Sequence, residues 1–430
     1  MKYLEIHDSN FDRQLRVVTK TSSLFDQNVD QRTREILTAV EQKGDSAVID
    51  YTKKFDKASL KPSQLQVSPS EMGLAWDEIP AKIKSALRLS HKNVKDFAKA
   101  SLRKNWTGKN AQGARVGEKY DPFHRVGIYV PGGKAPLVST VIMTVTLAKA
   151  AGCKEIVVAT PCNSEGNVNK YILAACKLAG ATEIYRVGGA QSIAALGYGT
   201  KKIAKVQKIY GPGNAYVVAA KRLLVGHVAI DLLPGPSELL VLADSSANSR
   251  WIAADLLAQA EHGSTDERVF LVSTSKKLLR DVEKHVQAQS KERNRSNYIS
   301  ATLKKNGFAI HVDSLDLGVK ITNAIAPEHC EVMLKKSRDV VKDITTAGAI
   351  FVGGYSPTAL GDYLAGPSHV LPTGGAGLSF PGLTVDQFQR RTSVVEFSKK
   401  SLSESLSALD TLAELEGLDA HARSGSIRIS

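Results

Sequence analysis

Two stretches of this chain alternate short β-branched runs with segments of helical character, and this alternation limits the folds that the chain can adopt. In the first stretch the strand-like runs are 126–130, 155–160, 184–187, 206–210 and 228–231. The helical segments between them are 138–151, 167–178, 190–196 and 215–224. Strands and helices that alternate at this pitch form βαβ units, so we expect a parallel sheet covered by helices.

The second stretch predicts a similar sheet. Its strand-like runs are 239–242, 269–272, 309–312 and 349–352. Its helical segments are 249–260, 276–289, 314–324 and 337–344. Because 430 residues are too many for one ordinary core, we expect an α/β protein with more than one domain.

The flanking segments are predicted to be mainly helical. Residues 1–25 form a short arm in this interpretation, and helices follow at 30–43, 45–55, after the capping box at 68–71, and at 81–100. Beyond the second stretch, 353–382 is glycine-rich and is expected to be a loop. The C-terminal segments are predicted as capping boxes at 384–387 and 401–404, an extended piece at 392–397, a helix at 414–423 and a strand at 426–430.

Charge and composition exclude several classes of protein. The net charge of +14 could suggest nucleic-acid binding, but the basic residues are spread over predicted helix faces without interleaved aromatics. We therefore expect no nucleic-acid partner. No stretch reaches the roughly 20 apolar residues of a membrane span, and no signal peptide is evident at the N-terminus. Four cysteines without paired spacing are expected to be free thiols, as in a cytoplasmic protein.

Glycine-rich turns follow three strands of the first stretch. They are Pro131-Gly132-Gly133, Gly188-Gly189-Ala190-Gln191 and Gly211-Pro212-Gly213-Asn214. In parallel α/β sheets, ligands bind beyond the carboxyl ends of the strands, where turn backbones and helix starts can contact phosphate. The Gly-x-Gly-x-x-Gly fingerprint is absent, so the pattern permits a dinucleotide without demonstrating one.

Polar residues of the second half could form a metal site. Gln259 and His262 are three residues apart at the end of a predicted helix that Gly263 would stop, so they share one helical face. With Asp362 and His421 they would form a nitrogen and oxygen ligand set suited to zinc or another first-row ion. The alternative is that these are unrelated surface and capping residues, and spacing alone favours that alternative.

A second group of polar residues could act as acids and bases. Glu328 and His329 are adjacent and are expected on a turn after a helix. A carboxylate can activate water and an imidazole titrates near neutral pH, so the two could act as an acid/base pair. His369 and Glu416 lie near the candidate ligands in sequence, in the glycine-rich segment and in the tail.

Eight short motifs occur in the order found in one known family. They are Tyr129-Val130-Pro131-Gly132-Gly133, Gly188-Gly189-Ala190-Gln191, Gly211-Pro212-Gly213-Asn214, Gly235-Pro236-Ser237-Glu238, Gln259-Ala260-Glu261-His262, Pro327-Glu328-His329, Gly366-Pro367-Ser368-His369-Val370-Leu371-Pro372-Thr373 and Glu416-Gly417-Leu418-Asp419-Ala420-His421. From about residue 28 to its C-terminus, the sequence resembles histidinol dehydrogenases.

The resemblance implies an activity and residue roles. Enzymes of this family oxidise L-histidinol to L-histidine through the aldehyde, with two NAD and one zinc per subunit, in the last step of histidine biosynthesis. By similarity, zinc would be held by Gln259, His262, Asp362 and His421. His329 would be the general base and Glu328 would activate water. The substrate would contact Ser237, Gln259, His262, Glu328, His329, Asp362, His369, Glu416 and His421. NAD would contact Tyr129, Gln191 and Asn214.

The resemblance also implies an architecture. We expect two incomplete Rossmann-like parallel-sheet domains, one inserted in the other, with an N-terminal arm and a helical C-terminal tail. The predicted boundaries are an arm at 1–25, a metal and substrate domain at 26–125 and 238–382, an NAD domain at 126–237 and a tail at 383–430. The family's active site is completed across a homodimer, so Glu416 and His421 would act in the neighbouring subunit.

Three rival functions remain open at this point. A related zinc- and NAD-dependent dehydrogenase of another small polar alcohol could use the same scaffold. A zinc hydrolase could use Glu328 and a metal-bound water without a nicotinamide. A basic nucleic-acid-binding protein would show salt-sensitive binding, which the dispersed lysines disfavour.

Overall fold

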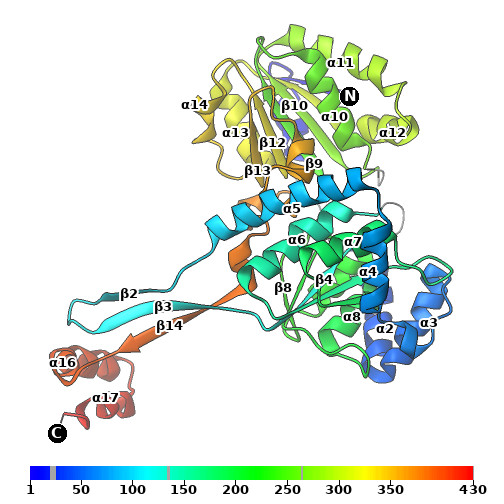
Figure 1. Ribbon diagram of the computed structural model, residues 1–430. Helices are drawn as coiled ribbons and strands as arrows, with labels where there is room; N and C mark the ends of the chain where they lie inside the picture. Colours follow the sequence, from blue (N-terminus) through cyan, green and yellow to red (C-terminus); the bar gives the residue numbers. More distant parts are fainter. Residues whose placement is uncertain (20–25, 133–135, 263–264, 430) are drawn as a thin grey trace.

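The computed structural model describes residues 1–19, 26–132, 136–262 and 265–429, so Gly133 and Gly263 of the predicted turns lie outside it. Figure 1 shows two α/β lobes, one above the other, and a C-terminal tail that extends away from both. One lobe contains a six-stranded parallel sheet and the other a five-stranded parallel sheet. The prediction of two parallel-sheet α/β units is confirmed.

The five-stranded lobe forms from the first alternating stretch. Its strands, in spatial order, are β6 (Glu183–Arg186), β5 (Glu155–Thr160), β4 (Arg125–Tyr129), β7 (Lys208–Tyr210) and β8 (Ala229–Ile230). Its crossover helices are α6 (Val138–Ala151), α7 (Lys170–Ala179), α8 (Gly189–Tyr198) and α9 (Ala215–Leu223). All five strands were predicted, because each is a short β-branched run between turn residues.

The early helices pack on this lobe, which corrects the expected domain assignment of 26–125. They are α2 (Gln27–Lys43), α3 (Asp45–Asp56), α4 (Pro69–Glu78) and α5 (Ala81–Ser101). Ile36 and Val40 of α2 share a core with α8 and α9, and Val94 of α5 shares one with α6. The apolar stripes of these helices predict that they are buried, but not against which sheet. The other predicted domain boundaries stay a prediction.

The six-stranded lobe contains the second stretch and the N-terminus. Its strands, in spatial order, are β1 (Lys2–Glu5), β11 (Gly307–His311), β10 (Arg268–Ser273), β9 (Glu238–Ala243), β12 (His329–Met333) and β13 (Ala349–Val352). Its helices are α1 (Phe11–Val18), α10 (Ser249–Ala260), α11 (Lys276–Ser290), α12 (Ser296–Asn306), α13 (Leu315–Ile325), α14 (Ser337–Val341) and α15 (Thr358–Tyr363). The described part of the predicted N-terminal arm is therefore an edge strand and a helix of this lobe, because Lys2–Glu5 pair with β11.

The tail begins with a three-stranded antiparallel sheet. β14 (Gln389–Glu396) pairs with β3 (Arg115–Pro122), which also pairs with β2 (Trp106–Lys109). Two helices follow, α16 (Lys399–Leu415) and α17 (Asp419–Ser426). The extended piece and the helical tail are confirmed. The strand predicted at 426–430 is wrong for its described residues, and α16 begins at the Ser398 cap rather than at Ser401. The segment predicted to open a helix at 384–387 forms only a short 3-10 turn, Val385–Phe388.

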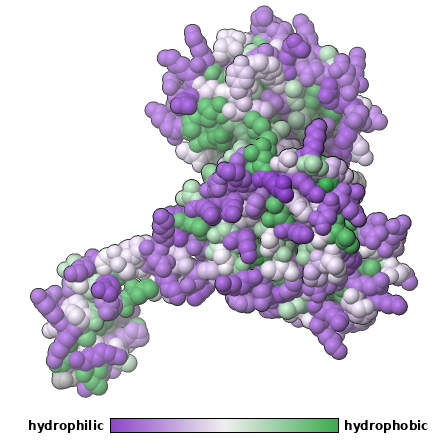
Figure 2. All heavy atoms as spheres, viewed as in Figure 1, coloured by the Kyte–Doolittle hydropathy of each residue, from purple (hydrophilic) through white to green (hydrophobic). Residues whose placement is uncertain are grey.

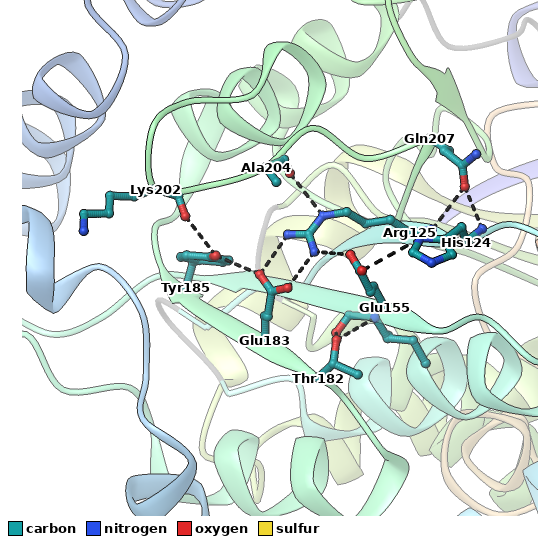
Figure 3. A network of polar contacts seen from close by, with 10 residues as sticks. His124, Arg125, Glu155, Thr182, Glu183, Tyr185, Lys202, Ala204 and Gln207 are labelled. Carbon is teal, nitrogen blue, oxygen red and sulfur yellow. Dashed lines mark hydrogen bonds and ion pairs between the residues drawn. The ribbon is translucent and has the colours of Figure 1, made fainter.

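A network of charged residues closes the amino ends of the five-stranded sheet (Figure 3). The Arg125 guanidinium at the start of β4 donates to both Glu183 oxygens, at 2.6 and 2.8 Å, and to Glu155 at 2.6 Å. The Tyr185 hydroxyl donates to Glu183 at 2.8 Å. These contacts join three adjacent strands at the edge opposite the glycine-rich turns. We infer that this network stabilises the sheet and leaves the carboxyl ends for ligands.

Within the described ranges, no helix is both long and apolar enough to cross a membrane.

Candidate active site

Glu328 and His329 lie at the amino end of β12, deep inside the six-stranded lobe. Both side chains are buried, at 6% and 5% exposure. They were expected on a turn, but His329 is the first residue of a strand whose five residues are all buried. The His329 ring donates through Nδ1 to the Glu238 carbonyl at 2.9 Å. Nε2 is thereby left without the proton, and it faces Asp362 Oδ1 at 3.9 Å.

Glu238, the first residue of β9, holds the pair from the neighbouring strand. Its backbone N–H donates to Glu328 Oε2 at 2.8 Å. Its own buried carboxylate accepts from Arg268 at 2.9 Å and from the Gly374 N–H at 3.0 Å. Sequence reasoning assigned no role to Glu238, although the residue belongs to one of the eight motifs. The active-site pair is thus fixed by two adjacent parallel strands.

Burial sets the protonation of this pair. It raises the pKa of Glu328 well above the ordinary value, helped by the nearby charges of Glu238 and Asp362. Burial lowers the pKa of His329 to about 4, although Asp362 opposes the shift. His329 is therefore a neutral imidazole at pH 7, with a lone pair on Nε2 that can accept a proton.

Three of the four candidate metal ligands lie in the two lobes, here called the body, at two helices near the Glu328–His329 pair. Gln259 and His262 lie at the C-terminal end of α10, where the His262 ring contacts the Gln259 carbonyl at 3.1 Å. Asp362 lies on α15, within the segment that was expected to be a loop. His369 Nδ1 donates to the Asp362 carbonyl at 3.1 Å and lies 3.9 Å from its carboxylate. His262 is close enough to lower the pKa values of His329 and His369 further.

A cavity of about 250 Å³ opens beside the pair. His329, His369, Ser356 and Ser368 contribute its polar groups, and β13, α15 and the segment that follows α15 contribute mostly apolar side chains. The five-stranded lobe supports that segment, since Ser90 and Asn93 of α5 donate to the carbonyls of Tyr363 and Leu364 at 2.5 and 2.8 Å. The site therefore lies where the two lobes meet.

The candidate nucleotide residues lie at the carboxyl ends of the five-stranded sheet. Tyr129 ends β4, and its hydroxyl accepts from the Gly189 N–H at 3.3 Å. Gln191 is 1% exposed, and neither polar atom of its amide has a partner among the described residues. Asn214 caps α9 through its side-chain oxygen and is exposed. The structure therefore leaves polar groups unused at this edge.

Asp56 lies at the same edge and was missed by sequence reasoning. It ends α3, far from any motif in the sequence. A Cβ atom placed on Gly188 would lie 3.5 Å from Asp56 Oδ2, and this buried oxygen has no partner in the described part of the chain. Burial raises the pKa of Asp56 to about 6. A single acidic residue at the end of a helix is common, so the sequence alone does not indicate that Asp56 lies beside the glycine-rich turns.

Comparison with known proteins identifies the family. Residues 19–429 match the histidinol dehydrogenase family. The histidinol dehydrogenase of Synechococcus sp. is 44% identical over 395 residues, which cover 92% of this chain and 91% of that protein. The chain belongs to the histidinol dehydrogenase family. It is therefore an oxidoreductase of histidine biosynthesis.

Other members of the histidinol dehydrogenase family cover the whole chain. The protein named histidinol dehydrogenase from Geobacter metallireducens is 40% identical over 430 residues, 100% of this chain and 98% of that one. The crystal structure of histidinol dehydrogenase from Elizabethkingia anophelis is 33% identical and superposes with a TM-score of 0.95, covering 100% of this chain and 98% of that chain. The family fold thus extends over both lobes and the tail.

Two residues that the family resemblance singled out lie away from the site in this chain. Glu416 follows the last residue of α16 and His421 lies on α17, in the tail that extends away from both lobes (Figure 1). Both side chains are exposed. In the described residues, no three His, Cys, Asp or Glu side chains of one chain are arranged to hold a metal ion. One subunit therefore brings Asp362, His369 and His262 close to the Glu328–His329 pair, but not the two tail residues.

Proposed function

We propose that this protein oxidises L-histidinol to L-histidine through L-histidinaldehyde, with two NAD as hydride acceptors and one zinc ion per subunit. The observation that carries the proposal is the buried pair Glu328–His329, in which His329 lines a small cavity together with His369 and faces Asp362. A neutral base, a carboxyl group of raised pKa and the imidazole of His369, whose pKa is lowered by burial, suit the removal of protons from an alcohol and from water.

The donor groups of the body suit zinc. Gln259, His262 and Asp362 offer amide, imidazole and carboxylate donors, which are ligands that first-row ions accept. The buried Gln259 Nε2 has no partner within the described ranges, so the fold does not hold this amide through its nitrogen; zinc would be bound by the amide oxygen. The C-terminal end of α10 carries a partial negative charge that favours a cation. Bound zinc would supply positive charge that orients the amino alcohol.

The fourth ligand is proposed to come from a second copy of the chain. Figure 2 shows hydrophobic side chains on the surface of the tail, and the exposed apolar residues there include Val395, Leu412, Leu415 and Ile427. An exposed apolar surface of this kind is typical of an interface. We propose a homodimer in which His421 of the partner subunit completes the zinc site and Glu416 of the partner subunit contacts the substrate.

The nucleotide side is proposed at Tyr129, Gln191 and Asn214. The unpartnered amide of Gln191 and the amide nitrogen of the exposed Asn214 can bind polar groups of NAD, as expected beyond the carboxyl ends of a parallel sheet. We add Asp56, because a buried carboxylate beside a glycine-rich turn can accept hydrogen bonds from ribose hydroxyls. Bound NAD would accept the hydride in each oxidation.

The residues of the chain handle the protons. As the hydride leaves the carbinol carbon, His329 Nε2 takes the hydroxyl proton and the aldehyde forms; Nδ1–H remains bound to the Glu238 carbonyl, which fixes the ring. Glu328 then takes a proton from the water that adds to the aldehyde. Because burial raises its pKa, this carboxylate is a stronger base than an exposed one. A second hydride and proton leave the hydrate to give the acid.

The test of the proposed function combines substrate, chelator and metal. Addition of L-histidinol and NAD should produce two NADH per histidine formed. A chelator should abolish the reaction and zinc should restore it. NADH formation with another small polar alcohol but not with L-histidinol would favour the related dehydrogenase, and zinc-dependent hydrolysis without NADH would favour the hydrolase.

A mixing experiment tests the shared site. The variants His329→Asn and His421→Asn should each be inactive as homodimers. In a mixed dimer, one of the two sites joins an intact body with an intact tail, so random exchange should restore about a quarter of the wild-type activity. If His421 acted within its own chain, mixing would restore nothing.

Asp56→Asn should stabilise the protein and weaken the binding of NAD. The folded state raises the pKa of Asp56 to about 6, so it holds the proton more tightly than the unfolded chain does. The free energy of unfolding of wild type therefore falls as the pH rises toward 6. Above that pH, the ionised Asp56 carboxylate continues to destabilise the folded state. We expect the variant to be about 1–2 kcal/mol more stable than wild type at pH 8 and similar to it near pH 4. The KM for NAD should rise about tenfold.

The exposed Asp50 of the same helix provides the control. Asp50→Asn should change neither the pH dependence of urea unfolding nor the KM for NAD. Equal NAD affinity in Asp56→Asn and wild type would remove Asp56 from the nucleotide site.

All four cysteines are free and buried, which supports a proposed location in a reducing compartment such as the cytoplasm.

A further inference from the structure

Three elements that carry the candidate active site meet at two acids, the buried Glu331 and the half-buried Asp255. Asp255 lies one helical turn before Gln259 on α10, and Glu331 lies two residues after His329 on β12. At these spacings each acid shares a face of its element with the site residue. The third element, α15, begins at Thr358, one turn before Asp362.

Glu331 contacts the start of α15 directly. Its Oε1 accepts from the Thr358 N–H at 2.8 Å and from the Thr358 hydroxyl at 2.5 Å. The N-cap residue, Pro357, makes no side-chain cap of its own, so a residue from β12 caps this helix. The position of Asp362 therefore depends on Glu331.

The other oxygen of Glu331, Oε2, is buried and has no hydrogen-bond donor among the described residues. The Asp255 carboxyl group on α10 lies close enough to Glu331 for each acid to shift the pKa of the other. A protonated Asp255 would donate to Oε2, whereas two ionised carboxylates have no donor between them. Burial, and then the charge of Glu331, raise the pKa of Asp255 to about 8. Asp255 thus holds its proton more tightly than an exposed aspartate does.

The pair has features that stability alone does not explain. Glu331 is 1% exposed, and neither acid forms a salt bridge with a cation of the described residues. An acid pair of this kind can often be replaced by apolar residues without loss of stability. Neither acid lines the cavity beside His329, so neither is placed to contact the substrate.

We propose that Asp255 and Glu331 form a proton-sharing carboxyl pair that positions the active site, by fixing α10, β12 and α15 relative to one another. The inference rests on the proposed function, because it assigns the pair to the geometry of Gln259, His329 and Asp362. Both acids are positioning residues: they act through the helices and the strand that carry these groups. Partners one layer behind metal ligands commonly change metal affinity or activity by about 10–100-fold when they are altered.

Paired variants separate positioning from stability. Glu331→Gln keeps the acceptor for Thr358 and offers an N–H donor to Asp255, so its kcat should remain within about threefold of wild type. The double variant Asp255→Val, Glu331→Leu should fold with equal or greater stability to urea, but with a kcat for L-histidinol at least about tenfold lower and zinc bound at least about tenfold more weakly. The KM for NAD should not change, because the nucleotide side lies on the other lobe.

Control variants on the same elements complete the experiment. Ile252→Val on α10 and Val332→Ala on β12 remove buried methyl groups and should lower stability while kcat stays within about twofold of wild type. If wild type fails to oxidise L-histidinol, the proposed function fails. If wild type is active and the double variant keeps its kcat and zinc affinity, the positioning pair is refuted. If the double variant does not fold, Glu331→Leu alone takes its place. The kcat of Glu331→Leu must then fall, while the kcat of Glu331→Gln stays near that of wild type.

Discussion

His329→Asn is expected to lower the turnover of L-histidinol by about 10²–10⁴-fold, while zinc remains bound. The imidazole lines the cavity and faces the Asp362 carboxylate. Its Nδ1 is fixed by the Glu238 carbonyl, so its Nε2 can accept a proton. An asparagine can keep the hydrogen bond to Glu238 but has no basic nitrogen. Steady-state NADH formation and metal content, measured on the same preparation, test the assignment.

Glu328→Gln serves as the matched variant, because it changes the neighbouring residue without changing its size. With L-histidinaldehyde as substrate, Glu328→Gln should be severely impaired, since water activation requires a carboxylate. His329→Asn that loses its zinc, or that oxidises L-histidinol at the wild-type rate, would contradict the role of His329 as base. Normal oxidation of the aldehyde by Glu328→Gln would contradict the role of Glu328.

The sequence predicted those parts of the fold whose local pattern matches their burial. The strands of the five-stranded sheet are β-branched runs between turns, and α10 was predicted with its observed bounds, Ser249–Ala260. β12 was missed because its five residues, His329–Met333, include an imidazole and the Glu331 carboxyl in a fully buried strand. Polar residues in a buried strand conceal its hydrophobic pattern, and here they do so because they belong to the active site.

The candidate site could be predicted only where local motifs carry it. The spacing of Gln259 and His262 placed both at the end of α10, as observed. The convergence of Asp362 with His329 comes from tertiary packing, which no spacing reveals. Asp56 reaches the glycine-rich turns only because α3 packs on the five-stranded lobe, and the sequence did not indicate that packing. The position of His421 depends on a second chain in our proposal, so neither spacing nor one subunit can supply it.

Lys221→Met should lower the free energy of unfolding by about 3–5 kcal/mol. The Lys221 side chain on α9 is completely buried with Asp231, and the two form an ion pair. Its ammonium also donates to the carbonyls of Gly211 and Leu232, at 3.0 and 2.9 Å. Methionine fills a similar volume but leaves the Asp231 carboxylate buried without a cation. Urea unfolding should show the loss, and Lys277→Met, which removes an exposed pair with Asp281, should cost less than about 1 kcal/mol.

The same ion pair connects stability to the nucleotide side. Asp231 Oδ2 accepts from the Gly211 N–H at 2.8 Å, so Lys221 and Asp231 together hold both backbone polar groups of Gly211, three residues before Asn214. Adding Asp231→Asn to Lys221→Met removes the unpaired charge and should recover most of the lost stability. The Gly211 carbonyl still lacks its donor in the double variant, so its KM for NAD should stay above that of wild type. A double variant with both stability and KM restored would mean that the ion pair supports the fold without shaping the turn that carries Asn214.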